Sequence, residues 1–238
     1  MLVAAAVCPC PPLLVPEVAA GAAPELDELR AACLDALGVL AASRPDRLVV
    51  IGPAEQAARG PHPQGTVGSF RAFGVDLEVR LGKATAETLA DRELSPSLTV
   101  AAWLLERMEW AAAPVAGLGV GESLAGERCM ETGSGLVAGA ERVALLVMGD
   151  GSACRTVKAP GYFDERAEGF DAEVARALGA ADTDALAALD QDLAYDLKSS
   201  GRACWQVLAG AAAGAGLSGA LLREEAPYGV GYFVAAWS

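Results

Sequence analysis

Two continuous apolar runs near the N-terminus flank a stretch with helical periodicity. Residues 2–7 are all apolar, as are the central residues of the segment RLVVIG at 47–52. Such runs are typical of strands that are buried on both faces. Between them, leucines recur at near-helical spacing (Leu26, Leu29, Leu34, Leu37, Leu40), and acidic residues stand at the start. The order strand, helix, strand predicts a βαβ unit with a parallel sheet.

The rest of the chain continues this alternation. The pattern predicts strands over 75–81, 113–120 and 142–148 and helices over 95–110 and 122–139, with Ser95 as N-cap and Pro96 in the first turn. Residues 52–74 are rich in glycine and proline and are expected to form a long loop. The region from 163 to about 214 reads as helical, and 217–237 as two strands around a Pro-Tyr-Gly turn. Since no linker-like change in composition divides residues 1–238, we expect one α/β domain.

Charge and hydropathy narrow the classes of function. The formal net charge of −13 disfavours binding to nucleic acids or to anionic membranes. No apolar stretch approaches the roughly 18 residues of a membrane span. The start of the chain lacks the positive region of a secretory signal, because the first basic residue is Arg30. We therefore expect a cytoplasmic protein. The mean hydropathy of +0.32 is high, and it suggests a homodimer that covers apolar surface.

Counts of cysteine and histidine exclude several kinds of site. The six cysteines form no CxxC pair, so a zinc ribbon or thioredoxin motif is not indicated. In a cytoplasmic chain they also argue against a disulfide framework. The sequence holds one histidine, His62, which is too few for a three-histidine zinc site or an HExxH protease helix. Neither a Walker motif nor a complete GxGxxG is present, so nucleotide binding is not favoured.

Candidate chemistry begins after the first strand. Cys8 and Cys10 lie two apart in an extended, proline-rich segment, so both thiols can point to one side. The pair could hold a soft metal ion or provide a reactive thiol; the alternative is that Cys8 is a buried apolar residue and Cys10 is inert. His62 stands in the polar segment GPHPQG, where a histidine is either merely solvated or functional.

Two further groups of polar residues follow strands. Asp150 and Ser152, in GDGSACR after the 142–148 strand, could present oxygens at the edge where open α/β sheets bind ligands. Equally, Gly149 and Gly151 could form a tight turn that Asp150 caps. Glu224 and Glu225 stand near the end of a strand, and since neighbours on a strand face opposite sides, one of the two could face a cleft.

Three segments in register resemble the LigB-type class III extradiol ring-cleaving dioxygenases and their bacterial relatives. CPCPPLLVPE at 8–17 is similar to that family's opening PHPPLLVPE, and MGDGSACR at 148–155 resembles its GD-x-S-H segment. EEAPYGVGYFVAAW at 224–237 resembles its closing strand with a GVGY core. The resemblance spans nearly the whole chain. It implies a mixed, mostly parallel α/β sheet with helices on both faces.

The family's chemistry uses ferrous iron held by two histidines and a glutamate, with a further histidine as acid/base. In this sequence the first ligand position falls on Cys10 and the second within 53–55. The acid/base position falls on Ala153, and the carboxylate corresponds to Glu224 or Glu225. Every imidazole is missing at these positions, and His62 lies outside them.

Loss of these imidazoles argues against iron-dependent ring cleavage in spite of the fold. We therefore expect neither iron nor another cofactor, and a cleft at the carboxyl ends of the strands that binds a small molecule or a protein partner. The alternatives are an enzyme of different chemistry that uses Cys10, His62 or Asp150, and a dioxygenase with an atypical metal site. The candidates for the cleft are Cys8, Cys10, Glu55, His62, Asp150, Ser152, Glu224, Glu225 and Tyr228.

Overall fold

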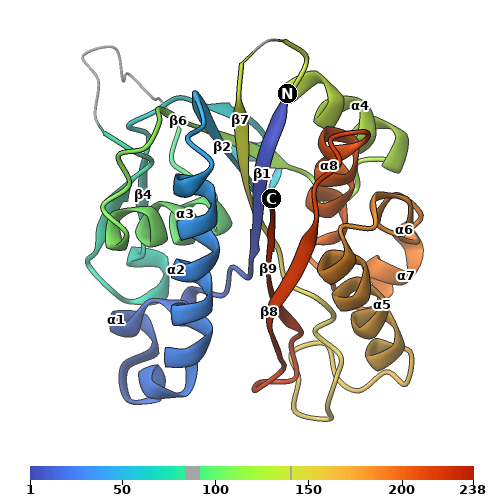
Figure 1. Ribbon diagram of the computed structural model, residues 1–238. Coiled ribbons are helices and arrows are strands. Elements are labelled where there is room, and N and C mark those ends of the chain that lie inside the picture. Colours follow the sequence, from blue (N-terminus) through green and yellow to red (C-terminus); the bar gives the residue numbers. More distant parts are fainter. Residues whose placement is uncertain (84–91, 140) are drawn as a thin grey trace.

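A seven-stranded sheet forms the centre of the molecule, and helices cover both of its faces (Figure 1). The computed structural model describes residues 1–83, 92–139 and 141–238. The strand order is β3-β6-β2-β7-β1-β9-β8, and a separate two-stranded sheet pairs β4 with β5. The strands are β1 Leu2–Cys8, β2 Arg47–Pro53, β3 Gly60–His62, β4 Val67–Ser69, β5 Glu78–Arg80, β6 Val115–Val120, β7 Val143–Met148, β8 Gly219–Glu225 and β9 Tyr232–Trp237.

The four central strands run parallel, and both edges of the sheet are antiparallel. β2 pairs in parallel with β6 and β7, and β7 pairs in parallel with β1. β9 joins β1 antiparallel and is followed by β8, while β3 pairs antiparallel with β6 at the other edge. The α/β fold with a mixed, mostly parallel sheet is therefore confirmed. Because the central strands are parallel, their carboxyl ends meet at one edge of the sheet.

Helices divide between the two faces of the sheet. α2 and α3 cover one face, and α4, α5 and α8 cover the other (Figure 1). The α-helices are α1 Pro16–Ala19, α2 Asp27–Ala42, α3 Pro96–Arg107, α4 Gly126–Leu136, α5 Ala167–Ala180, α6 Thr183–Ala187, α7 Gln191–Asp196 and α8 Arg202–Ala212. Ser95 caps α3 as expected, because its side chain accepts a hydrogen bond from the Leu98 N–H.

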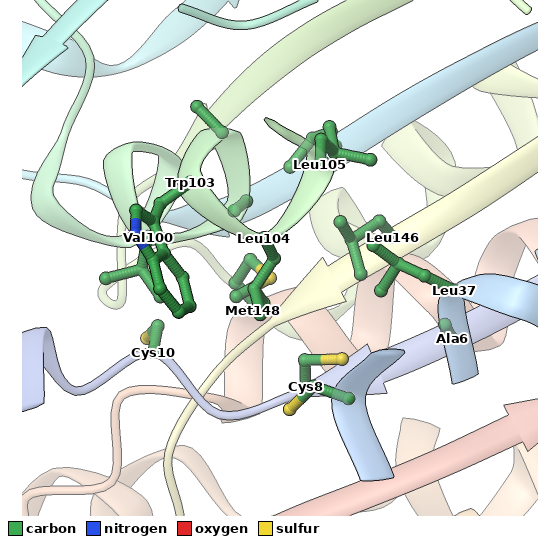
Figure 2. Packing of buried hydrophobic residues seen from close by; sticks show 14 of the residues in the cluster. Ala6, Cys8, Cys10, Leu37, Val100, Trp103, Leu104, Leu105, Leu146 and Met148 are labelled. Atoms are coloured by element: carbon green, nitrogen blue, oxygen red, sulfur yellow. The ribbon is translucent and has the colours of Figure 1, made fainter. Parts of the chain in front are cut away.

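Alternate residues of the buried strands supply the two apolar cores. Ala4, Ala6 and Cys8 of β1 face the α2–α3 side, whereas Ala5 and Val7 face the α8 side. All five are fully buried, as the continuous apolar run predicts. Figure 2 shows the first core, where Cys8 and Cys10 lie among side chains of α2, α3 and β7. The predicted common side of the two cysteines is therefore observed.

The expected long loop over 52–74 is wrong in part, because it contains β3 and β4. β3 lies against Gly117 and Gly119 of β6, and a Cβ atom at Gly117 would come within 3.2 Å of the His62 Cβ. The glycines of β6 thus admit a short strand that local periodicity does not reveal. His62 is only 2% exposed, so its expected place in a solvated loop is also wrong.

The helical region after 163 is divided into separate helices. Asp182 and Asp190 accept hydrogen bonds from the backbone N–H groups of Ala185 and Leu193, and so each begins a new helix, α6 and α7. In the described parts of the chain, no helix is both long and apolar enough to cross a membrane.

Candidate functional site

A cavity of about 380 Å³ opens at the carboxyl ends of the parallel strands. Its walls come from the segments that follow β1, β2, β6 and β7, together with the start of α3 and the turn before α8. The lining residues are Cys10, Pro53, Ala54, Glu55, Arg59, Pro96, Ser97, Glu122, Asp150 and Ser200. Open α/β sheets bind their ligands at this edge. We therefore take this cavity, called the cleft below, as the candidate site.

Cys10 and Asp150 are joined across the cleft wall. The Cys10 N–H donates a hydrogen bond of 2.8 Å to Oδ1 of Asp150. Burial raises the pKa of the Asp150 carboxyl to about 7, although the hydrogen bonds from Cys10 oppose the rise. Burial also raises the pKa of the Cys10 thiol well above its usual value, and the nearby Asp150 raises it further. The thiol is therefore held protonated, which makes it a poor nucleophile and a poor metal ligand.

Glu122 brings a second partly buried carboxyl group to the cleft. It follows β6, and its carboxylate accepts a hydrogen bond from the Ala203 N–H in the first turn of α8. Burial raises the pKa of Glu122 to about 7, and the Arg202 guanidinium opposes the rise. Oε1 of Glu122 is buried and has no hydrogen-bond partner among the described residues. Such an orphaned oxygen costs free energy unless a further donor reaches it.

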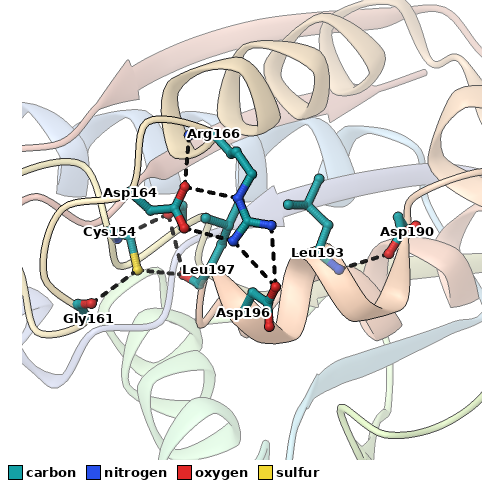
Figure 3. A network of polar contacts seen from close by, with 9 residues as sticks. Cys154, Gly161, Asp164, Arg166, Asp190, Leu193, Asp196 and Leu197 are labelled. Atoms are coloured by element: carbon teal, nitrogen blue, oxygen red, sulfur yellow. Dashed lines mark hydrogen bonds and ion pairs between the residues drawn. The ribbon is translucent and has the colours of Figure 1, made fainter.

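The turn before α8 is fastened to the strand end that carries Asp150. The Asp150 carbonyl accepts hydrogen bonds from the Ser200 N–H at 3.1 Å and the Ser199 hydroxyl at 3.0 Å. Figure 3 shows how the preceding residues are held: the Cys154 thiol contacts the Leu197 carbonyl, and Arg166 contacts Asp196. These contacts fix the wall that Ser200 contributes to the cleft.

The two glycines after β7 allow neighbouring atoms to approach the backbone closely, and neither of them forms a left-handed turn. A Cβ atom at Gly149 would lie 2.6 Å from the Gly201 Cα, and one at Gly151 would lie 2.7 Å from Oδ1 of Asp171. Neither glycine has a positive φ angle. The tight-turn interpretation of this segment is therefore replaced by one of packing, and the Asp150 side chain is directed to Cys10.

Three of the residues predicted for the cleft line it, namely Cys10, Glu55 and Asp150. Cys8 lies deeper in the core, where its side chain contacts the thiol of Cys33. His62 is turned toward the Ala58 carbonyl, which lies 2.8 Å from Nε2. His62 therefore does not join Cys10 or Asp150 at the cleft.

The remaining predicted residues lie outside the cleft lining. Ser152 is fully buried, and its hydroxyl donates to the Leu197 carbonyl. Glu224 is exposed on β8, and Glu225 pairs with Arg223. The Tyr228 hydroxyl donates to Glu25 at 3.0 Å. The interpretation that Glu224 or Glu225 faces this cavity therefore finds no counterpart in its lining.

Several lining residues were missed by the sequence interpretation. The sequence pattern predicts that a helix starts at Glu122, but α4 begins at Gly126. Ser97, Arg59 and Ser200 also line the cleft, and none of them belongs to a recognisable sequence motif. The signal that could have identified Glu122 is its place directly after a buried strand, the same signal that singled out Asp150.

The donor groups of the cleft do not fit a ferrous iron site. The two histidine positions implied by the resemblance are occupied by the Cys10 thiol and by residues 53–55, which bring a carboxylate and no imidazole. Cys10 is held as a neutral thiol, and Ala153 offers no side-chain donor. Within residues 1–83, 92–139 and 141–238, no group of three or more His, Cys, Asp or Glu side chains is arranged to hold a metal ion.

Comparison with solved structures gives distant structural likenesses to this chain. No family model and no curated protein matches the chain. The crystal structure of the uncharacterized protein JW3007 from Escherichia coli K12 is similar over 99% of both chains, with a TM-score of 0.48 and 14% sequence identity. At this level of similarity no ligand, activity or site residue is transferred to the present chain.

Proposed function

We propose that this chain is a LigB-like protein whose cleft binds a small molecule and does not carry out iron-dependent ring cleavage. The observation that carries the proposal is the make-up of the cleft. Two positions that the resemblance assigns to iron ligands, Cys10 and the segment 53–55, line one cavity at the expected sheet edge. At the position of the first imidazole stands Cys10, a neutral thiol that is hydrogen-bonded to Asp150.

A volume of about 380 Å³ lies within the range of small-molecule sites. The walls combine apolar surface from Pro53, Ala54 and Pro96 with a few polar groups that converge on the cavity. This mixture is typical of a site that encloses an organic ligand and orients it by a few hydrogen bonds.

An enzyme that uses Cys10 as a nucleophile is the second candidate. It would need a base or a cation that lowers the thiol pKa. Asp150, the carboxyl group beside Cys10, raises that pKa, and His62 is engaged elsewhere. The geometry thus favours binding over thiol chemistry.

One experiment addresses the iron-free claim. The purified chain is incubated anaerobically with ferrous iron, desalted, analysed for metal and then assayed for oxygen uptake with catechol. We expect iron far below one ion per chain and no oxygen uptake above the protein-free control. Stoichiometric iron together with catechol turnover would contradict the proposal.

A cavity-filling variant addresses the claim that the cleft binds a ligand. We expect amide NMR signals of the lining residues to move with a subset of compounds in a fragment collection. Ser200→Phe should abolish these shifts because its ring would occupy the cleft. Ser134→Phe, at an exposed position of α4, is the matched control and should leave them unchanged. Shifts that survive Ser200→Phe would place the binding elsewhere.

A further inference from the structure

A second cavity borders the cleft. This cavity has a volume of about 300 Å³ and shares two lining residues with the cleft, Glu122 and Ser200. Its other lining residues are Gln191, Ala194, Tyr195, Lys198, Ser199 and Arg202. The Tyr195 side chain at this place is 81% exposed, which is unusual for an aromatic ring. Glu122 and Ser200 therefore stand where the two cavities adjoin, and the exposed ring of Tyr195 lines the second cavity.

The carboxyl groups at this meeting point lack a paired cation. Neither Glu122 nor Asp150 forms an ion pair with any described residue, and Asp150 acts on Glu122 as a like charge. Arg202, whose charge acts on Glu122, directs its two terminal nitrogens to the carbonyls of Glu122 and Leu124 and to the side chain of Gln206. Arg59, which also lines the cleft, directs its Nε to the Ala54 carbonyl. Arg202 thus forms no ion pair with either carboxylate, although its charge acts on Glu122 and its Nε has no hydrogen-bond partner among the described residues.

One acceptor at this place lacks a donor. Oε1 of Glu122 is buried without a hydrogen-bond partner. Asp150, which lines the cleft, accepts hydrogen bonds from the N–H and the thiol of Cys10 and forms no ion pair with a described residue. Buried polar oxygens in native proteins normally have partners, so a group that donates several hydrogen bonds would complete this place.

We infer that the ligand of the cleft is an organic cation whose ammonium group lies between Asp150 and Glu122 and whose apolar body extends into the second cavity beside Tyr195. The inference rests on the proposed function and specifies the ligand class. An ammonium group brings three donors and a positive charge that can pair with both carboxylates. A carboxylate ligand would meet like charge, and a neutral alcohol would supply a donor without the charge.

Three compounds of matched length test the inference with the full chain. Calorimetric titration at pH 8 compares 4-phenylbutylamine, 4-phenylbutan-1-ol and 4-phenylbutyrate. We expect the amine to bind at least about tenfold more tightly than the alcohol, which is a difference of roughly 1.4 kcal/mol, and the carboxylate to show no binding.

Variants then locate the cation and the body of the ligand. Asp150→Asn and Glu122→Gln keep the shape of each side chain and should each weaken amine binding about tenfold or more. Glu127→Gln on exposed α4 is the matched control and should bind like the unaltered chain. Tyr195→Ala should weaken binding of the amine about threefold, since a ring contact is lost.

Equal binding of the amine and the alcohol would overturn the inference, and so would preferred binding of the carboxylate, yet both results would leave a ligand-binding cleft in place. Amine binding that Asp150→Asn and Glu122→Gln leave unchanged would overturn it as well. Absence of amine binding overturns the inference alone, because the proposed function is judged by the fragment shifts and the Ser200→Phe variant.

Discussion

Two aspartates lie on either side of one short segment and have different roles: Asp171 is fully buried and Asp150 is partly buried. Asp150 stands just after β7, and Asp171 on α5 packs against the residues that follow. Asp171 accepts a hydrogen bond of 2.8 Å from the Ser152 N–H and forms a 3.0 Å ion pair with Arg155. Asp150 has Cys10 as its hydrogen-bonding neighbour and has no cation beside it.

The difference lies in how far each carboxylate is satisfied. Asp171 has a donor on each oxygen, and the glycines Gly151 and Gly231 bring the backbone close around it. A fully partnered, fully buried carboxylate holds parts of the fold together. Asp150 keeps unused acceptor capacity at the wall of a cavity, and this is what a ligand can use. The carboxylate without a paired cation thus belongs to the cleft, and the fully paired one belongs to the framework of the fold.

The largest expected effect is that of Asp171→Ala. Removal of the carboxylate leaves the buried Ser152 N–H without its partner and leaves Arg155 with the more distant, exposed Glu168 at 4.0 Å. We expect the free energy of unfolding to fall by about 3–5 kcal/mol, as for other broken buried ion pairs. Urea denaturation measures this change. Glu173→Gln, which breaks an exposed pair with Arg176, should cost under about 1 kcal/mol. Similar losses for the two variants would contradict the structural role of Asp171.

Asp150→Asn is expected to raise the free energy of unfolding, by an amount that depends on pH. Because the pKa of Asp150 is raised to about 7 in the folded chain, the folded state binds its proton more tightly than the unfolded state does. The free energy of unfolding should therefore fall as the pH rises from about 4 to about 7. Asn cannot ionise, so the variant should be more stable than the unaltered chain above pH 7, by roughly 1–3 kcal/mol.

The groups around Asp150 complicate this titration in a defined way. Cys10 and Tyr232 have raised pKa values because of burial, so both stay neutral in this range, whereas Glu122 also titrates near 7. Asp150→Asn should therefore reduce the pH dependence without removing it, and the double variant with Glu122→Gln should reduce it further. Denaturation curves at pH 5.5, 7 and 8.5 measure this. An unaltered slope in the single variant would show that Asp150 is ionised in the ordinary range.

A smaller effect concerns the thiol beside Asp150. Because its pKa is raised, Cys10 should react with iodoacetamide at pH 8 at least about tenfold more slowly than free cysteine. Peptide mapping by mass spectrometry follows the rate at this residue. Asp150→Asn should speed the reaction modestly, since a negative neighbour is removed. A rate faster than that of free cysteine would favour the thiol enzyme instead.

The smallest expected effect is that of Glu224→Gln. This carboxylate is exposed on β8 and lies outside the cleft lining. Its replacement should change the free energy of unfolding by less than about 0.5 kcal/mol and leave amine binding unaltered. A marked loss of amine binding would indicate that the site lies toward β8 and β9 instead.

The sequence predicts those features that depend on neighbouring residues. β1, β2 and β7 follow from continuous apolar runs, and Asp150 follows from its position after the strongest of them. His62 was misplaced because β3 exists through pairing with the glycines of β6, more than fifty residues away in sequence. Glu122 was missed because its burial depends on α8, which arrives from a distant part of the chain. The local pattern of apolar and polar residues does not indicate contacts between segments that are far apart in sequence.

The most direct test of the unpaired carboxylate is its titration by carbon-detected NMR, with the Asp150 signal assigned by comparison with Asp150→Asn. We expect a pKa of about 7 in the free protein and a clearly lower value when 4-phenylbutylamine is bound, since the cation stabilises the ionised form. A pKa near 4 in the free protein, or one that the amine leaves unmoved, would contradict the account.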